Sequence, residues 1–339
     1  MSTNSPATLP STLFPWQADN WHTLWQMRQQ NRLAHGLLFV GVDGIGKRQF
    51  AQTFANSMLC SKPADAGVAC GECQNCHLIT AGTHPDLVWI EPEEEGKKIG
   101  VDQIRGIIKS VNETSLKGGY RLIIINPASA MNVNAANALL KTLEEPAPNT
   151  LLILINNPAL RLPATIISRC HKIIFNSVDH AAALSWLKQH LSETKISPEL
   201  LLKLAHGAPL KALTLVEKDL LTKRREFYQG FYSLSEGKID PITLAAKWYD
   251  TDHIYVVDLI ISWLTDLLRY KVTADPAVLT NDDYKTEITK VSVAMLRANL
   301  LAYIDAVHQV RAVLLSSVNL NKQLLLEDLF IRWADYVPG

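Results

Sequence analysis

The sequence lacks a net charge, a long hydrophobic run and any internal repeat. Its 33 basic residues are balanced by 33 acidic ones, so it has no overall positive field of the kind that attracts nucleic acid or anionic membranes. The most apolar helical stretch, IYVVDLIISWLTDLL, contains two Asp and is too short to cross a bilayer. We therefore expect no membrane partner, and DNA contact only through a local patch or through other subunits.

A secretory leader and disulfide bonds are also not expected. The first residues, MSTNSPATLPSTLFPW, contain no basic segment followed by an apolar one. This favours a cytoplasmic location. Of the 5 cysteines, all but one lie between positions 60 and 76. In the cytoplasm such clustering is more typical of a metal site than of disulfides.

What the first half of the chain does contain is a series of short apolar runs, which predict strands. These runs are GLLFVG (36–41), DLVWIEP (86–92), YRLIIIN (120–126), TLLILIN (150–156) and CHKIIF (170–175). Helical patterns alternate with them, at 47–60, 101–114 and 132–146. Such alternation is typical of a parallel α/β sheet covered by helices on both faces.

After about residue 175 the sequence predicts only helices. Two helical segments, at 180–191 and 197–216, suggest a small unit that pauses at HGAP. From about residue 220 apolar residues recur at three- and four-residue steps, which predicts longer helices whose apolar stripes could meet partner helices. A stripe of this kind is more often internal core than interface. At 339 residues the chain is long enough for two or three domains.

The expected fold class is therefore α/β plus all-α. The predicted domains are a parallel-sheet domain at 1–175 with a cysteine insertion at 60–76, a small helical domain at 176–219, and a larger helical domain at 220–339. The charged segment EPEEEGKK, which follows the second predicted strand, is interpreted as a solvated loop without chemistry.

The segment GVDGIGKR matches the phosphate-loop pattern G-x-x-x-x-G-K. Backbone N–H groups around Gly41, Gly44 and Gly46 could hold phosphates at a helix N-terminus, and Lys47 could reach the β- and γ-oxygens. The predicted order of strand, loop and helix supports a phosphate-loop fold.

Two features of this loop argue against ATP hydrolysis. The motif continues with Ser or Thr, whose hydroxyl binds Mg²⁺, but here Arg48 follows, and a guanidinium cannot ligate a cation. The acidic partner should end the third predicted strand, where Asn126 and Pro127 stand instead. We expect a degenerate site that hydrolyses nothing. Nucleotide binding without turnover stays open.

The clustered cysteines predict a zinc site. Cys60, Cys70, Cys73 and Cys76 supply four thiolates, enough for a closed tetrahedral Zn²⁺ site. Four thiolates leave no open position for water, so the expected role is structural. The nearby histidines at positions 77 and 84 are the alternative ligands, although each is more simply an ordinary polar residue.

Several motifs together resemble the clamp-loader branch of the AAA+ proteins. They are the phosphate loop, the four-cysteine insertion, AGTHPD, NALLKTLEEP and SRC. The resemblance implies an AAA+ sheet domain, a helical lid and a C-terminal helical collar for oligomerisation. It also implies that Arg169, within SRC, is an arginine finger that acts on ATP bound by the neighbouring subunit. The local alternative is that Arg169 pairs with a nearby acid.

The implied function is that of a non-hydrolysing clamp-loader subunit of a replicative DNA polymerase III holoenzyme. Its implied partners are the gamma- or tau-type ATPases, the delta subunit, the sliding clamp and, through the complex, primer-template DNA. No activity is expected from the isolated chain, because nucleotidyl transfer belongs to the complex. Against the family pattern of active ATPases, the chain departs at Arg48, Asn126 and Pro127. It departs also near Leu210, where a sensor Arg is expected, while Asn156 stands at the other sensor position.

Two other functions remain possible from the sequence. The first is a working ATPase of the gamma type, which would have to hold Mg²⁺ without the usual hydroxyl and carboxylate. The second is a free-standing, zinc-dependent nucleic-acid binder. Neutral charge disfavours it, since neutralising several phosphates requires a basic surface.

Overall fold

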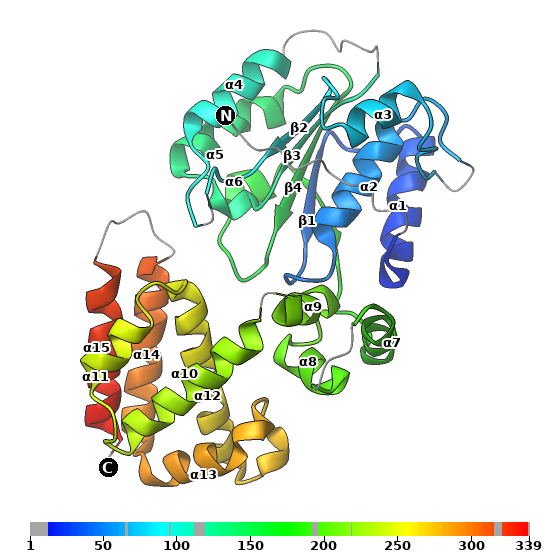
Figure 1. Ribbon diagram of the computed structural model, residues 1–339. Helices are drawn as coiled ribbons and strands as arrows, with labels where there is room; N and C mark the ends of the chain where they lie inside the picture. The colour runs from blue at the N-terminus through cyan, green and yellow to red at the C-terminus, as the bar shows by residue number, and fades with distance from the viewer. Residues whose placement is uncertain are drawn as a thin grey trace. The chain divides into compact units, whose positions relative to one another are not determined.

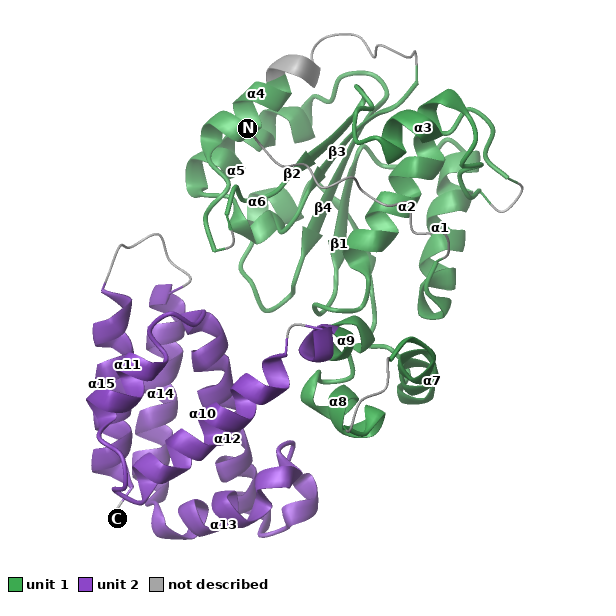
Figure 2. Cartoon of the chain, viewed as in Figure 1, with its two compact units in different colours: residues 1–213 green, residues 214–339 purple. Residues whose placement is uncertain are grey.

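The chain divides into two compact units, residues 1–213 and 214–339, which are described separately (Figure 2). The computed structural model describes residues 13–64, 67–94, 96–111, 119–191, 196–217, 219–314 and 321–337. Within these ranges no helix combines the length and the apolar character that a membrane crossing requires.

A five-stranded parallel sheet lies at the centre of the first unit, as the sequence predicts. The strand order is β2-β3-β4-β1-β5, and every pairing is parallel. The strands are β1 (Gly36–Val40), β2 (Leu87–Ile90), β3 (Arg121–Ile125), β4 (Thr150–Asn156) and β5 (His171–Ile174). Strands β3 and β4 are buried along their whole length, which explains why their sequences read as continuous apolar runs.

Helices cover both faces of this sheet, with α1 and α2 on one side and α4 and α5 on the other (Figure 1). The helices here are α1 (Ala18–Gln29), α2 (Lys47–Leu59), α3 (Gln74–Thr80), α4 (Val101–Val111), α5 (Val133–Glu144) and α6 (Ala164–Ile167), with short 3₁₀ helices at Pro15–Gln17 (η1) and Ala128–Ala130 (η2). The helix predicted at 101–114 is found to residue 111, and its last three positions lie outside the described residues.

Alternate side chains of β1 point to the two helical layers. Leu38 packs in one buried cluster with Ile104 of α4 and Leu139 of α5. Its neighbour Phe39 faces the other way, and its ring lies 5.5 Å from that of Phe50 in α2. The two cores on either side of the sheet fix the position of the loop that joins β1 to α2.

Among the described residues, the small helical group that follows β5 contains three helices. They are α7 (His180–His190), α8 (Pro198–Leu204) and α9 (Pro209–Glu217). Side chains of Asp179 and Ser197 accept backbone N–H groups and cap the first two helices. The pause predicted at HGAP is a turn in which His206 and Gly207 have positive φ. The two domain boundaries drawn from the sequence, after residues 175 and 219, stay predictions, while the compact units divide after residue 213.

The second unit is all helical. Its helices are α10 (Leu220–Ser235), α11 (Pro241–Lys247), α12 (His253–Thr273), α13 (Lys285–Ala294), α14 (Arg297–Leu314) and α15 (Lys322–Tyr336), with 3₁₀ turns at Pro276–Val278 (η3) and Asp282–Tyr284 (η4). The stripe residues Val257, Leu264, Leu300 and Val307 are buried in the core of this unit itself. The stripes therefore find their partners within the chain and do not by themselves indicate an interface.

Candidate functional site

The phosphate-loop segment joins the carboxyl end of β1 to the start of α2, the edge at which parallel α/β sheets bind ligands. Gly44 and Gly46 have φ of +78° and +90°, a region that glycine enters without steric cost. Gly46 is the residue from which α2 begins. The predicted order of strand, loop and helix is confirmed.

Lys47 does not extend from this loop toward solvent. Its Nζ donates to the carbonyl oxygens of Gly41 and Val42, both at 2.6 Å, and lies 3.5 Å from Asp43 Oδ1. The side chain is only 6% exposed. Burial lowers the pKa of Lys47, while Asp43 acts to raise it. An ammonium has three N–H donors, and here the loop itself accepts from them.

The N-terminal segment covers one side of the loop. Gln17 Nε2 donates to the carbonyl oxygens of Ile45 and Gly46 at 3.1 and 3.0 Å, and the Trp16 indole N–H donates to Ile45 at 3.0 Å. A Cβ added at Gly46 would lie 2.6 Å from the ring of Phe14. The loop has no space there for a larger residue.

The aromatic residues of this cover join it to the small helical group. The rings of Phe14 and Trp16 are stacked, with centroids 5.0 Å apart. Both meet the ring of Trp186 in α7 edge to face, at 5.5 and 5.7 Å. These contacts hold the cover between the loop and α7.

The start of α9 packs against the same loop. The backbone N–H of Leu210 donates to the carbonyl oxygen of Gly44 at 3.0 Å. A Cβ at Gly44 would lie 2.6 Å from Lys211 Cβ and 2.8 Å from its backbone nitrogen. Leu210, near which the resemblance predicts a sensor Arg, therefore contacts the loop through its backbone.

Arg48 lies where the motif expects a magnesium ligand, and it binds an acid. Its Nε and Nη2 donate to Glu91 Oε1 and Oε2 at 3.0 and 3.3 Å, and its guanidinium lies 4.8 Å from the centroid of the Trp89 ring. Asn126, at the position of the missing acid, donates its Nδ2 to Glu91 Oε1 at 3.0 Å. Burial acts to raise the pKa of Glu91, but hydrogen bonds from Arg48 and Asn126 hold it below its usual value. A guanidinium therefore neutralises the carboxylate beside the loop.

Asn156, at the other sensor position, directs its amide to nearby backbone. Its Nδ2 donates to the carbonyl oxygens of Asn157 and Leu160 at 3.0 and 3.1 Å. The next residue, Asn157, donates to Asp43 Oδ2 at 2.6 Å. The side-chain amide of Asn156 therefore stabilises the loop that follows β4.

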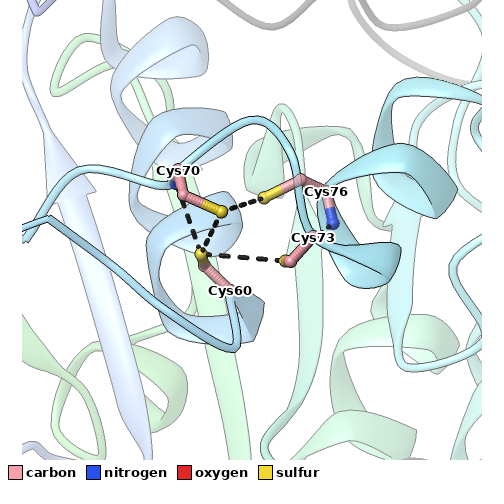
Figure 3. Close-up of side chains that lie close together, drawn as sticks. All are labelled: Cys60, Cys70, Cys73 and Cys76. Carbon is pink, nitrogen blue, oxygen red and sulfur yellow. Dashed lines mark hydrogen bonds between the residues drawn. The ribbon is translucent and has the colours of Figure 1, made fainter.

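The four predicted cysteines come together in space. All their Sγ atoms lie within 4.8 Å of one another (Figure 3). Cys60 is the C-cap of α2, Cys73 is the N-cap of α3 and Cys76 lies in the first turn of that helix. Cys70 belongs to the loop between the two helices. Asn75 Nδ2 donates to Leu59 O at 2.8 Å and ties the two helices together.

The distances in the cysteine cluster fit a tetrahedral metal site. Cys60 Sγ lies 3.5 Å from Cys70 Sγ and 3.9 Å from Cys73 Sγ, and Cys70 Sγ lies 3.9 Å from Cys76 Sγ. Tetrahedral zinc with Zn–S bonds of about 2.3 Å requires a sulfur–sulfur separation of about 3.8 Å. The four thiols therefore match the donor set that Zn²⁺ prefers, and these three separations lie close to the required spacing.

Burial and backbone N–H groups act in opposite directions on the thiols of the cluster, and at Cys60 burial prevails and raises the pKa. The amides of Lys62 and Cys70 lie 3.4 and 3.3 Å from Cys60 Sγ. Burial acts to raise the pKa of Cys73, but the N–H of Cys76 and other donors lower it to about 6. Burial raises the pKa of Cys76. The group of possible ligands found among the described residues contains no histidine, and His84 Nδ1 accepts the backbone N–H of Asp86 at 3.1 Å.

Arg169 lies between α6 and β5, half-exposed, and is bound to an acid. Its Nε and Nη2 lie 2.9 and 2.5 Å from Glu144 Oε1, and its Nη1 donates to Thr165 O at 2.9 Å and Ser168 Oγ at 3.4 Å. The local pairing considered for this residue is therefore present. It does not exclude a role toward a neighbour, because the group is 35% exposed. Cys170 is buried, and burial raises its pKa to about 11.

Sequence reasoning missed the partners of the predicted residues. Glu91 begins the segment interpreted as a loop without chemistry, and it is an exception to that interpretation. It directly follows a buried strand, a position from which parallel sheets present polar groups to ligands, and this signal could have identified it. Phe14, Gln17 and Glu144 gave no such signal, because their contacts depend on the fold.

The fold and the loop define a phosphate-loop domain of the AAA+ class, with a second, helical unit. A family described as DNA polymerase III, delta subunit, matches residues 16–179, and the C-terminal part of a DNA polymerase III delta subunit matches residues 218–335. The chain belongs to the delta-prime family of DNA polymerase III subunits.

Two relatives of that name match along nearly their whole length. DNA polymerase III subunit delta' of Pseudomonas aeruginosa is 40% identical, over 96% of this chain and 98% of the relative. The subunit of the same name from Escherichia coli is 30% identical, over 96% and 97%. The tau/gamma subunit of Haemophilus influenzae is also 30% identical, but the match covers 62% of this chain and 31% of that protein.

Proposed function

We propose that this chain is a clamp-loader subunit in DNA replication that does not itself hydrolyse ATP. The clamp-loader role follows from membership of the delta-prime family over nearly the whole chain. The proposal that the chain does not hydrolyse ATP rests on the contacts of Lys47 and Arg48 at the loop. Lys47 is bound to the loop's own carbonyl oxygens, and Arg48 is bound to Glu91. Neither a phosphate nor a magnesium ion would find its usual ligand.

The same geometry speaks against a working ATPase of the gamma type. Such an enzyme needs a hydroxyl after the loop lysine and an acid at the end of β3 to hold Mg²⁺. Here the corresponding groups are a guanidinium and an amide, which donate to Glu91. We infer that nucleotide binding is weak at best, since Lys47 would have to leave its acceptors.

The proposed contribution to ATP hydrolysis is made in trans. Arg169 would reach the γ-phosphate of ATP bound to a neighbouring ATPase subunit and stabilise the charge that develops there. Its partial exposure supports this role. The proposed neighbours are tau/gamma-type ATPases and the delta subunit. The assembled loader would act on the sliding clamp and primer-template DNA in the cytoplasm.

The four cysteines would hold a structural Zn²⁺. The metal would join the end of α2, the loop after it and α3, and so support the segment that leads into β2. A closed set of four thiolates leaves no position for a reacting water, so no step of ATP hydrolysis passes through this site. The match of the sulfur separations to tetrahedral zinc supports the assignment.

The test is the DNA-stimulated ATPase rate of the reconstituted loader with native chain and with Arg169→Ala. Removing a trans finger costs about 10³–10⁵ in rate at the site it serves, while the other ATP sites keep part of the total. Arg161→Ala is the matched control, because it removes an exposed arginine in the same region. An unchanged rate with Arg169→Ala, in a complex that still assembles and binds ATP, would leave Arg169 without a role in hydrolysis.

A further inference from the structure

The guanidinium of Arg169 is held from two directions. Glu144, the last residue of α5, accepts from Nε and lies 2.5 Å from Nη2 as an ion-pair partner, while the carbonyl of Thr165 and the hydroxyl of Ser168 accept from Nη1. A guanidinium has five N–H donors. The hydrogen bonds found among the described residues use the Nε–H and both Nη1–H groups, so the Nη2 group keeps donor capacity beside its ion-pair contact with Glu144. The group is therefore fixed in orientation and keeps a donor for an incoming anion.

Glu144 stands at a place where an acid is locally unfavourable. The carboxyl end of a helix carries a partial negative charge, and basic residues are preferred there. Glu144 ends α5, and Glu145 directly follows it at the C-cap. An acid that violates the local preference of its helix is expected to serve a purpose elsewhere. The contact that Glu144 makes is with Arg169, 25 residues further along the chain.

We infer that Glu144 is a positioning residue for the arginine finger. This rests on the proposed trans role of Arg169 and names the residue that makes the finger effective. A long arginine side chain samples many rotamers, and a finger must be ordered when it meets the phosphate. Glu144 orders the Arg169 side chain in advance, through its contact with Nε. The loss of side-chain entropy therefore does not add to the barrier in the transition state.

The expected effect appears in turnover and not in ATP affinity. Glu144 belongs to a different chain from the bound ATP in the proposed arrangement, and it acts only through Arg169. Replacing Glu144 with Ala should lower the Arg169-dependent part of the rate by about tenfold, which corresponds to about 1.4 kcal/mol. The Arg169-dependent part is the portion of the DNA-stimulated rate that Arg169→Ala abolishes. KM for ATP should stay the same.

The experiment compares five loaders reconstituted with full-length chain. They contain the native chain, Glu144→Ala, Glu145→Ala, Arg169→Ala and the double variant Glu144→Ala/Arg169→Ala. Glu145 is the matched control, because it is the neighbouring exposed acid at the same helix end. Assembly is checked by size-exclusion chromatography, and kcat and KM are measured with primed DNA and clamp.

Positioning predicts that Glu144→Ala lowers kcat, that Glu145→Ala does not, and that Glu144→Ala changes nothing further once Arg169 is removed. A purely structural effect of Glu144 would persist in the double variant, and that result overturns the inference. A native rate with Glu144→Ala also overturns the inference. A raised rate overturns it as well, because it would show that Glu144 holds Arg169 away from the phosphate. If Arg169→Ala itself has no effect, the trans role fails, and the inference fails with it.

Discussion

Lys47 is predicted to stabilise the fold rather than to bind nucleotide, and Lys47→Met tests this directly. In a nucleotide-binding loop, removing the lysine abolishes binding and leaves stability largely intact. Here the ammonium donates to the carbonyl oxygens of Gly41 and Val42. Methionine keeps the apolar stem and removes both hydrogen bonds. The variant should therefore lose stability, while nucleotide affinity has little to lose.

The magnitude follows from the contacts. A hydrogen bond to a charged group contributes about 1.5–3 kcal/mol, so two contribute about 3–6 kcal/mol before the cost of burying the ammonium is subtracted. That cost is real, because burial lowers the pKa of Lys47. We expect a net loss of about 1–3 kcal/mol. In a unit of this size each kcal/mol lowers Tm by roughly 2–4 °C, so the expected shift is roughly 2–12 °C.

Calorimetry and binding of a fluorescent ATP analogue provide the two readouts. The same net 1–3 kcal/mol, at about 1.4 kcal/mol per decade, would weaken nucleotide binding by roughly one to two decades relative to an open loop. Lys211→Met is the matched control, because that lysine is exposed beside the same loop. An unchanged Tm for Lys47→Met, together with micromolar ATP binding by the native chain, would refute the reasoning and show that Lys47 faces a phosphate.

Three further predictions concern the neighbouring sites. Metal analysis should find about one zinc per chain, and Cys73→Ser should lose it and melt at a lower temperature; a metal-free native chain of unchanged stability would contradict the zinc assignment. Gly46→Ala should lower the unfolding free energy by at least about 1 kcal/mol more than Gly82→Ala. Both positions have positive φ, +90° and +69°, but the new Cβ meets ring atoms at 2.6 Å only at Gly46 and open space at Gly82. Equal losses would contradict the steric argument. Arg48→Leu should raise the pKa of Glu91, measured by NMR titration. Since the folded-state pKa is depressed, the native pair stabilises above the usual value of 4.5 and loses this effect as the pH falls through the folded pKa; identical titration in both proteins would exclude the pairing.

The sequence predicted the elements whose signal is local. The strand at 150–156 has the predicted bounds, because a strand buried on both faces is apolar throughout. The cysteine cluster was likewise predictable, since thiolates at C-x2-C spacing within one short segment have few other uses in a reducing compartment. In each case the residues that decide the outcome lie close together in the chain.

The missed features depend on contacts between distant segments. Arg48 and Glu91 are 43 residues apart, and Arg169 and Glu144 are 25 apart. Periodicity and spacing carry no information on which charged side chains the fold will bring together. The apolar stripes of the second unit illustrate the same limit. A stripe indicates that one face of a helix is buried, but not whether the residues that bury it belong to the same chain.

The glycines of the phosphate loop have a consequence for how such sequences are classified. A Cβ at Gly41 would lie 2.7 Å from the carbonyl oxygen of Phe175, and those at Gly44 and Gly46 would meet Lys211 and Phe14. Packing alone thus demands glycine at all three positions, whether or not a nucleotide ever enters the loop. A motif scan would count this chain among the ATP binders for a pattern that steric selection suffices to maintain. The glycine pattern of this loop is therefore no evidence of nucleotide binding by itself, because packing in the folded chain requires the same residues.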